Sequence, residues 1–254
     1  RATQRYHFAT TGASRRGLAR FDDAMPVHSR DSRLNASIAL AANLLVPVVG
    51  FANPDSAPVC PDSIARVSAE SAVDRRDACA GAADAIRFFA QLGLPPIEAP
   101  SIVVTASLPV QAGPSAAGAF LEQHQRSYIL SYARFKAMGT WLGVRIDRRM
   151  YRSLAAHETA HALAANHFAL PRPTIQAKEY IAYVAMFCAM EPHLRVKALR
   201  ATPGTGFANE AQITELLYLF DPMRFGAEAY RHFTKSEVGP PFVKAILEGK
   251  ALLD

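Results

Sequence analysis

Cysteine is scarce in this 254-residue chain, and no two of its three cysteines form a C-x-x-C pair. This absence argues against thiolate zinc sites and against thioredoxin chemistry. Internal repeats and low-complexity linkers are also missing. With 50% hydrophobic and 20% charged residues, the composition excludes a disordered or collagen-like chain and suits one globular domain.

Acidic residues are outnumbered, with 22 Asp and Glu against 28 Lys and Arg, for a net charge of +6. Such an excess first suggests an anionic partner such as nucleic acid. Residues 1–52, however, hold seven Arg and three Asp (+4), whereas residues 53–254 hold 21 basic and 19 acidic groups (+2). The part expected to fold is nearly neutral, so we expect no nucleic-acid partner.

Charge is absent from residues 34–54, which form an apolar stretch preceded by Arg30 and Arg33. Residues 50–52 (Gly-Phe-Ala) supply a small-x-small cleavage pattern. This layout is typical of a secretory signal peptide. A membrane anchor needs about 20 strongly apolar residues, and Asn, Pro and Gly interrupt this stretch, so we expect cleavage and no stable anchor.

Met25 could open such a signal sequence, because residues 1–24 contain no Met. Residues 1–24 are then either an over-extended reading frame or a disordered basic tail. We predict an N-terminal extension and signal peptide over residues 1–52 and one domain over residues 53–254. The protein is expected to be secreted or periplasmic.

Export makes the cysteines informative. In an oxidising compartment, Cys60 and Cys79 are expected to pair, which would stabilise the fold by roughly 3 kcal/mol. Cys188 lies in an apolar run and is expected to be a buried small hydrophobe rather than a nucleophile.

The order of predicted elements indicates an α+β fold, a small antiparallel or mixed sheet followed by a helical C-terminal half. Helical periodicity spans residues 74–92, and a short β-branched segment over residues 101–108 predicts a strand. The aromatic content of residues 118–146 predicts two or three antiparallel strands, with turns near Gln123 and Gly139. Asp147 is the expected N-cap of a long helix reaching about His167. Further helices are predicted over residues 175–190, 213–220, 224–233 and 241–253.

The long helix carries His157, Glu158 and His161. Residues four apart project from nearly the same side of a helix, so the two imidazoles can bind one ion, and neutral imidazoles suit Zn²⁺. Glu158 can then act as the base that removes a proton from an activated water molecule. This is the H-E-x-x-H pattern of metal-dependent peptide hydrolysis. Without a metal, the same residues would be two histidines on an amphipathic helix with Glu158 in solvent.

A catalytic zinc needs a third protein ligand, and two residues compete for this role. Glu179 lies near the start of the next predicted helix, where burial of its carboxylate would need a partner such as a metal. His167 extends the pattern to three histidines, but Ala164 stands where that pattern has a helix-breaking glycine. We favour Glu179 and keep His167 as the alternative.

With Glu179 as third ligand, the motif resembles that of the gluzincin zinc metallopeptidases, and in particular their minimal bacterial members. The resemblance covers roughly residues 118–190. It implies that His157, His161 and Glu179 bind zinc and that Glu158 is the catalytic base. It also implies a zincin-like fold, in which an edge strand holds extended substrate in front of the active-site helix.

The chain departs from this pattern at Tyr183, where thermolysin-like enzymes carry an aspartate that orients a zinc-binding histidine. Catalysis further requires a group that stabilises the oxyanion. Tyr183, Tyr230 and His232 are the candidates.

These observations predict a zinc-dependent hydrolase of peptide bonds acting on a peptide or protein substrate. Two alternatives remain: an exported zinc-binding or scaffold protein without turnover, and a hydrolase that uses His167 in place of Glu179. Substrate sequence, endo- or exopeptidase action and oligomeric state do not follow from the sequence.

Overall fold

A four-stranded sheet forms the first part of the computed structural model, which describes residues 57–113 and 116–252. Its strands are β1 (Arg66–Ser68), β2 (Ser101–Thr105), β3 (Gly118–Leu121) and β4 (Arg126–Leu130). They are arranged in the order β1-β2-β4-β3, with β1, β2 and β4 parallel and β3 antiparallel to β4. β3 is therefore an edge strand of this sheet.

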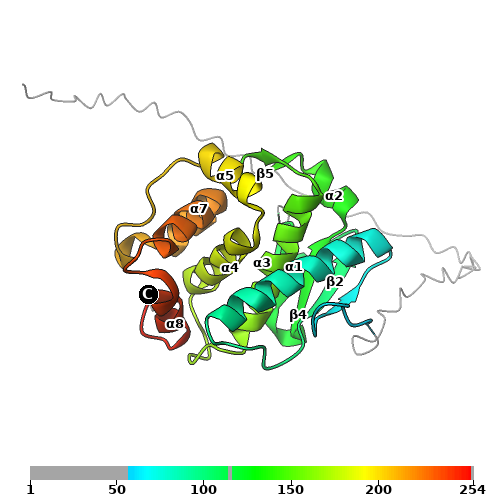
Figure 1. Ribbon diagram of the computed structural model, residues 1–254, viewed down its shortest axis with the longest axis horizontal. Helices are drawn as coiled ribbons and strands as arrows, with labels where there is room; N and C mark the ends of the chain where they lie inside the picture. Colours follow the sequence, from blue (N-terminus) through cyan, green and yellow to red (C-terminus); the bar gives the residue numbers. More distant parts are fainter. Residues whose placement is uncertain (1–56, 114–115, 253–254) are drawn as a thin grey trace, which may run out of the picture. The chain divides into compact units, whose positions relative to one another are not determined.

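Two long helices pack on this sheet and on each other, α1 (Ala72–Gln91) and α3 (Arg148–Ala165). Figure 1 shows α1 crossing the strands. The side chain of Ser71 caps α1 by accepting a hydrogen bond from the Asp74 amide. Asp147 caps α3 in the same way through the Met150 amide, which confirms the predicted start of that helix.

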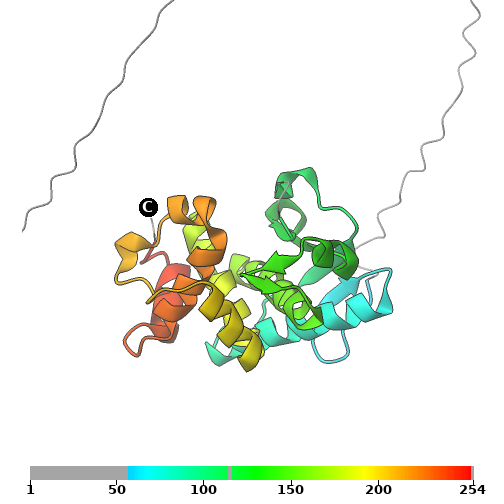
Figure 2. The same cartoon turned by 90° about the horizontal axis from the view of Figure 1, so that it is seen from above.

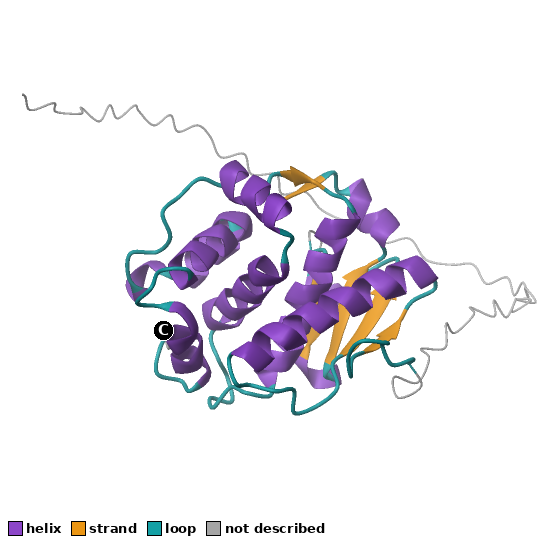
Figure 3. Ribbon diagram, viewed as in Figure 1, coloured by secondary structure: helices purple, strands orange, loops and turns teal. Residues whose placement is uncertain are grey.

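Helices form the C-terminal half of the chain, as predicted. They are α4 (Ile175–Ala189), α5 (Pro192–Ala201), α6 (Glu215–Phe220), α7 (Pro222–Phe233) and α8 (Gly239–Leu247). Figures 2 and 3 show these helices to one side of the sheet, with α4 next to α3. Short 3₁₀ segments lie at η2 (Val110–Ala112), η3 (Glu122–His124) and η4 (Glu210–Gln212). The fold is thus α+β, with a small mixed sheet followed by a helical half.

The expected antiparallel strands over residues 118–146 are present as β3 with β4 and as a short hairpin, but a helix separates the two pairs. Residues 132–137 form a helix, α2 (Tyr132–Ala137), and the two-residue strands β5 (Thr140–Trp141) and β6 (Val144–Arg145) make a separate hairpin. In this segment, an aromatic residue that suggested a strand packs in the core from a helix instead. Phe135 on α2 is fully buried against Trp141 and Tyr151.

A disulfide joins Cys60, ahead of β1, to Cys79 on α1, as predicted. Cys188 carries a free thiol and is half-buried. Burial raises the pKa of this thiol to about 12. A thiol with so high a pKa is a poor nucleophile near neutral pH, in keeping with a packing role.

The predicted extension and signal peptide, residues 1–52, lie outside the described residues. Within the described part, none of the helices has the length and apolar content needed to cross a membrane.

Replacing Cys60 and Cys79 together by serine is expected to lower the free energy of unfolding by about 3 kcal/mol, because the bridge restricts a long loop of the unfolded chain. Urea denaturation of the two proteins measures the difference. As a control, a thiol reductant should destabilise the native protein by the same amount and leave the double variant unchanged. An equal response of both proteins to the reductant would contradict this role of the bridge.

Candidate metal centre

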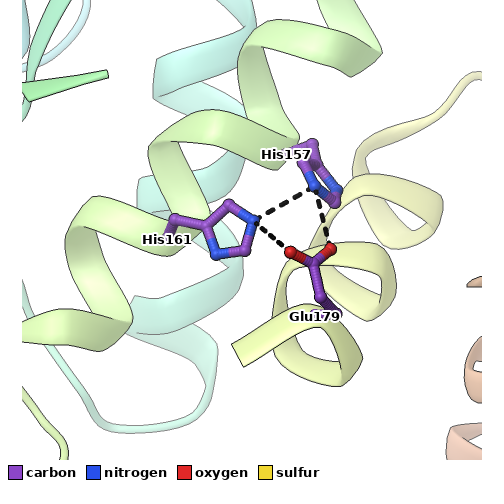
Figure 4. A group of neighbouring side chains, drawn as sticks. All are labelled: His157, His161 and Glu179. Carbon is purple, nitrogen blue, oxygen red and sulfur yellow. Dashed lines mark hydrogen bonds and ion pairs between the residues drawn. The ribbon is translucent and has the colours of Figure 1, made fainter. Parts of the chain in front are cut away.

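Helix α3 directs His157 and His161 to one point on its surface, because the two residues are four apart. The two Nε2 atoms lie 3.2 Å apart. Both side chains are largely shielded from solvent, with 7% and 12% of their surface exposed. Figure 4 shows the two rings converging toward the neighbouring helix α4.

Glu179 reaches the two histidines from α4. This helix begins after Thr174, whose side chain caps it through the Ala177 amide, so Glu179 falls in its second turn. Its carboxylate oxygens lie 3.6 Å from His157 Nε2 and 3.5 Å from His161 Nε2. One ligand atom from each of the three residues lies within 4.8 Å of the others, so the cluster could hold a metal ion.

The separations within this cluster fit a tetrahedral metal. Ligands bound to zinc at 2.0–2.1 Å in tetrahedral geometry lie about 3.3 Å from one another. The observed separations are 3.2, 3.5 and 3.6 Å. Two imidazole nitrogens and one carboxylate also leave a fourth coordination position for water or substrate, as in catalytic zinc sites.

The electrostatics of the cluster favour a bound cation. Burial lowers the pKa of His157 well below its usual value and that of His161 to about 4, so both rings are neutral near pH 7. Burial also raises the pKa of Glu179 to about 7. In the described part of the chain, neither Lys nor Arg forms an ion pair with Glu179 or Glu158. A divalent ion would supply the charge that offsets the burial of these carboxylates.

Glu158 lies beside the cluster and faces the edge strand. Its Oε2 atom is buried and has no hydrogen-bond partner among the described residues. Burial, and then the charge of Glu179, raise the pKa of Glu158 well above its usual value. A buried polar atom without a partner costs about 1–3 kcal/mol, so such an atom points to a ligand or water at this position.

Gly118 on β3 makes room for this carboxylate. A Cβ atom at Gly118 would lie 2.5 Å from Glu158 Oε1, so any larger residue would force the side chain to move. The Glu158 carbonyl accepts a hydrogen bond from Ser127 on β4, which ties α3 to the sheet at this level. Together these contacts hold Glu158 between the helix and the edge strand.

The cluster opens into a cavity of about 450 Å³. Its walls are β3 and the segment before it, α3, the start of α4, and α6. The lining includes the three cluster residues, Glu158, Tyr183, Tyr218, Trp141, Leu154 and residues 116–122. The candidate site is therefore accessible along the edge strand.

Tyr183 and Tyr218 both line this cavity. The ring of Tyr183 packs edge-on against the His157 imidazole, with ring centroids 4.6 Å apart. Gly226 on α7 allows this position, since a Cβ there would lie 2.2 Å from the Tyr183 ring. His157 Nδ1 itself is buried without a hydrogen-bond partner in the described structure. Tyr183 therefore contacts His157 by ring packing, and its hydroxyl is not a partner of His157 Nδ1.

Tyr218 on α6 lies beside Glu179, and burial, followed by the charge of Glu179, raises the pKa of its hydroxyl. The sequence alone does not single out this residue. It lies in the run Leu216-Leu217-Tyr218-Leu219-Phe220, which resembles any apolar helix segment. No local signal could have placed it beside a residue 39 positions earlier.

The structure does not bring Tyr230 and His232 to the cluster. The Tyr230 ring stacks on Phe187, with centroids 5.2 Å apart. His232 Nδ1 lies 2.8 Å from the hydroxyl of Tyr180 in the core. Neither residue lines the cavity. Both residues lie on a helix, α7, as predicted. This helix directs their side chains toward α4 and not toward the cluster.

His167, the alternative third ligand, lies beyond the last turn of α3. Its Nε2 atom is 3.1 Å from the Pro95 carbonyl oxygen, and its ring stacks on Phe89. The cluster with the two ligand histidines includes Glu179 and not His167.

Removal of any one member of the cluster is expected to weaken Zn²⁺ binding at least 100-fold, because each supplies one of only three protein ligands. Titration of the apoprotein against a competing chelator measures this for His157→Ala, His161→Ala and Glu179→Ala. His167→Ala is the control and should bind zinc as the native chain does. Loss of binding in His167→Ala with retention in Glu179→Ala would contradict the assignment.

A family model described as a family of unknown function (DUF6639) matches residues 65–254. No curated protein and no solved structure matches the chain.

Proposed function

We propose that this chain, which belongs to the DUF6639 family of unknown function, is a zinc-dependent peptidase of zincin-like architecture. One observation carries the proposal: the cluster of two imidazoles and a carboxylate adjoins the unpartnered Glu158 carboxylate at an open cavity. The order of these groups along the chain resembles that of the gluzincins, with α3 as the active-site helix.

His157, His161 and Glu179 would hold the ion. When bound, zinc would supply Lewis acidity, which lowers the pKa of water and polarises a carbonyl group. Glu158 would act as the base. Its Oε2 atom accepts a proton from the attacking water and passes that proton to the amine that leaves.

The edge strand β3 is suited to hold the substrate. Its outer side has no partner strand in the described sheet, and residues 118–121 line the cavity. A peptide in extended conformation can add to such an edge through main-chain hydrogen bonds, which do not depend on its sequence. This arrangement would set the scissile bond opposite Glu158, which faces Gly118.

Tyr218 is the best-placed group to stabilise the oxyanion. Its side chain lies beside the Glu179 carboxylate and lines the cavity. A phenol is a strong hydrogen-bond donor that stays protonated when its pKa is raised. In this proposal Tyr218 takes the role for which the sequence offered Tyr183, Tyr230 and His232.

Export is part of the same proposal. The disulfide between Cys60 and Cys79 is typical of proteins from oxidising compartments. Together with the signal-like pattern over residues 25–52, it supports a secreted or periplasmic enzyme that acts on peptides or proteins.

A zinc-binding protein without turnover is the second candidate. A ligand histidine in a zinc enzyme usually donates its other ring N–H to a partner that orients the ring. His157 Nδ1 has no such partner within the described residues, and this observation favours the second candidate.

The substitution Glu158→Gln distinguishes the two candidates. It removes the base while keeping the shape of the side chain, so we expect peptide hydrolysis to fall about 10³-fold with zinc content unchanged. Cleavage of a mixed peptide library, followed by mass spectrometry, gives the activity. Glu98→Gln, at an exposed carboxylate that does not line the cavity, is the control and should stay within a few-fold of the native enzyme. If the zinc-loaded native chain cleaves no peptide, the second candidate stands.

Tyr218→Phe tests the oxyanion role. Loss of one donor is expected to lower kcat about 10²-fold, while KM and zinc content change little. Steady-state kinetics on a peptide found in the library gives both constants. Tyr230→Phe is the matched control and should leave kcat unchanged. The opposite pattern, with kcat reduced only in Tyr230→Phe, would refute the role of Tyr218.

A further inference from the structure

Helix α6 exposes a group of large apolar side chains. Leu216, Leu219 and Phe220 are 64%, 62% and 80% exposed. Leu216 precedes the other two by four residues or fewer, at the spacing that places all three on one face of the helix. Single exposed apolar residues are common on proteins, but several on one face are typical of a binding surface. These three residues are called the α6 face below.

Contacts on the opposite side of the helix hold the α6 face in place. Leu217 and Tyr218 are half-buried and pack against the core, with the ring centroids of Tyr218 and Phe225 5.7 Å apart. The Thr214 side chain accepts a hydrogen bond from the Leu217 amide and so caps the helix. The exposed side chains therefore project from a preformed helix.

The α6 face is continuous with the cavity that contains the metal cluster. Leu219 lines this cavity, and Pro222 and Met223, at the start of α7, belong to the same apolar wall. The other two residues of the α6 face adjoin Leu219 on the helix surface and continue the wall outside the cavity. A substrate in the cavity therefore contacts Leu219, and a longer substrate can reach the rest of the face.

The edge strand β3 lines the same cavity. A peptide that pairs with β3, as proposed above, would thus lie in one cavity with Leu219. An extended peptide presents every second side chain to the same side. Apolar residues at alternate positions can therefore contact the α6 wall while the main chain bonds to β3.

Charges at the two ends of α6 favour a peptide over a lipid surface. Helix α6 contains neither Lys nor Arg, and the exposed residues Glu215 and Asp221 lie at its start and just after its end. Anionic lipid surfaces attract Lys and Arg, so these two carboxylates oppose binding to such a surface. They favour a peptide that carries basic residues next to its apolar ones.

We infer that the α6 face is the wall of the substrate-binding cleft that selects apolar side chains. The inference rests on the proposed function, because it takes the cavity as the peptide site. Removal of the exposed leucine and phenylalanine surface from water would supply the binding free energy. The substrate class is thus peptides with bulky apolar residues at alternate positions and basic residues among them.

Two dye-labelled peptides test this surface without turnover. One has the sequence Lys-Leu-Thr-Leu-Lys-Leu-Thr-Leu-Lys, and the other has Ser in place of each Leu, so both carry the same charge. Zinc-loaded Glu158→Gln is the protein used, because loss of the base keeps the peptides intact. Fluorescence anisotropy should show the leucine peptide binding about tenfold more tightly than the serine peptide.

The double variant Leu219→Ser with Phe220→Ser, made in the same background, should bind the leucine peptide about tenfold more weakly and the serine peptide as before. Both side chains are more than half exposed, so the fold and the zinc content should stay unchanged. Ile97→Ser with Val196→Ser is the matched control, because these apolar side chains are also exposed and do not line the cavity. The control should keep the tenfold preference.

Equal binding of the two peptides, or a preference that survives the double variant, would overturn the inference. Two further results would assign the α6 face to a different occupant and overturn it as well. One is binding of the native chain to vesicles of phosphatidylcholine and phosphatidylglycerol that the double variant abolishes. The other is a dimer of the native chain in sedimentation that the double variant converts to a monomer.

Failure of the proposed function gives a different result. A chain that prefers the leucine peptide through the α6 face but, with Glu158 intact, cleaves no peptide has the binding surface and lacks the activity. A chain that cleaves peptides equally well with and without Leu219 and Phe220 has the activity and lacks the α6 contact.

Discussion

The packing of α3 against α4 is the contact on which the candidate site depends. It brings two histidines of one helix within 3.6 Å of a glutamate of the other. Alanines such as Ala160 on α3 and Ala182 and Ala185 on α4 are fully buried. Small side chains let helices approach closely, and a close approach is what allows short imidazole and carboxylate side chains to meet. A shift of one turn in either helix would separate the three groups.

This packing also creates an electrostatic demand. Two carboxyl groups, Glu158 and Glu179, are buried beside imidazoles that burial keeps neutral. Such an arrangement is costly unless a cation or a ligand compensates it. The unpartnered Oε2 atom of Glu158 adds to this cost. Groups that destabilise a fold in this way are typical of sites where chemistry or binding takes place.

The two parts of the fold contribute different components. The sheet part supplies the edge strand β3, and its Gly118 gives Glu158 access to the groove. The helical part supplies Glu179 and Tyr218, which line the same cavity. α3 lies between the two parts and carries His157, Glu158 and His161. The site therefore forms only when the sheet and the C-terminal helices pack on the same helix.

Local sequence by itself determined the features that depend on short-range geometry. The spacing of His157 and His161 fixed their common direction on α3, Asp147 marked the start of that helix, and Cys60 and Cys79 were the pair to bridge. Only the tertiary structure decided that Glu179 and not His167 joins the histidines, that Tyr218 lies beside them, and that the aromatic segment after β4 forms α2. These outcomes depend on how separate helices pack through many buried contacts, and no pattern within a single segment encodes that packing.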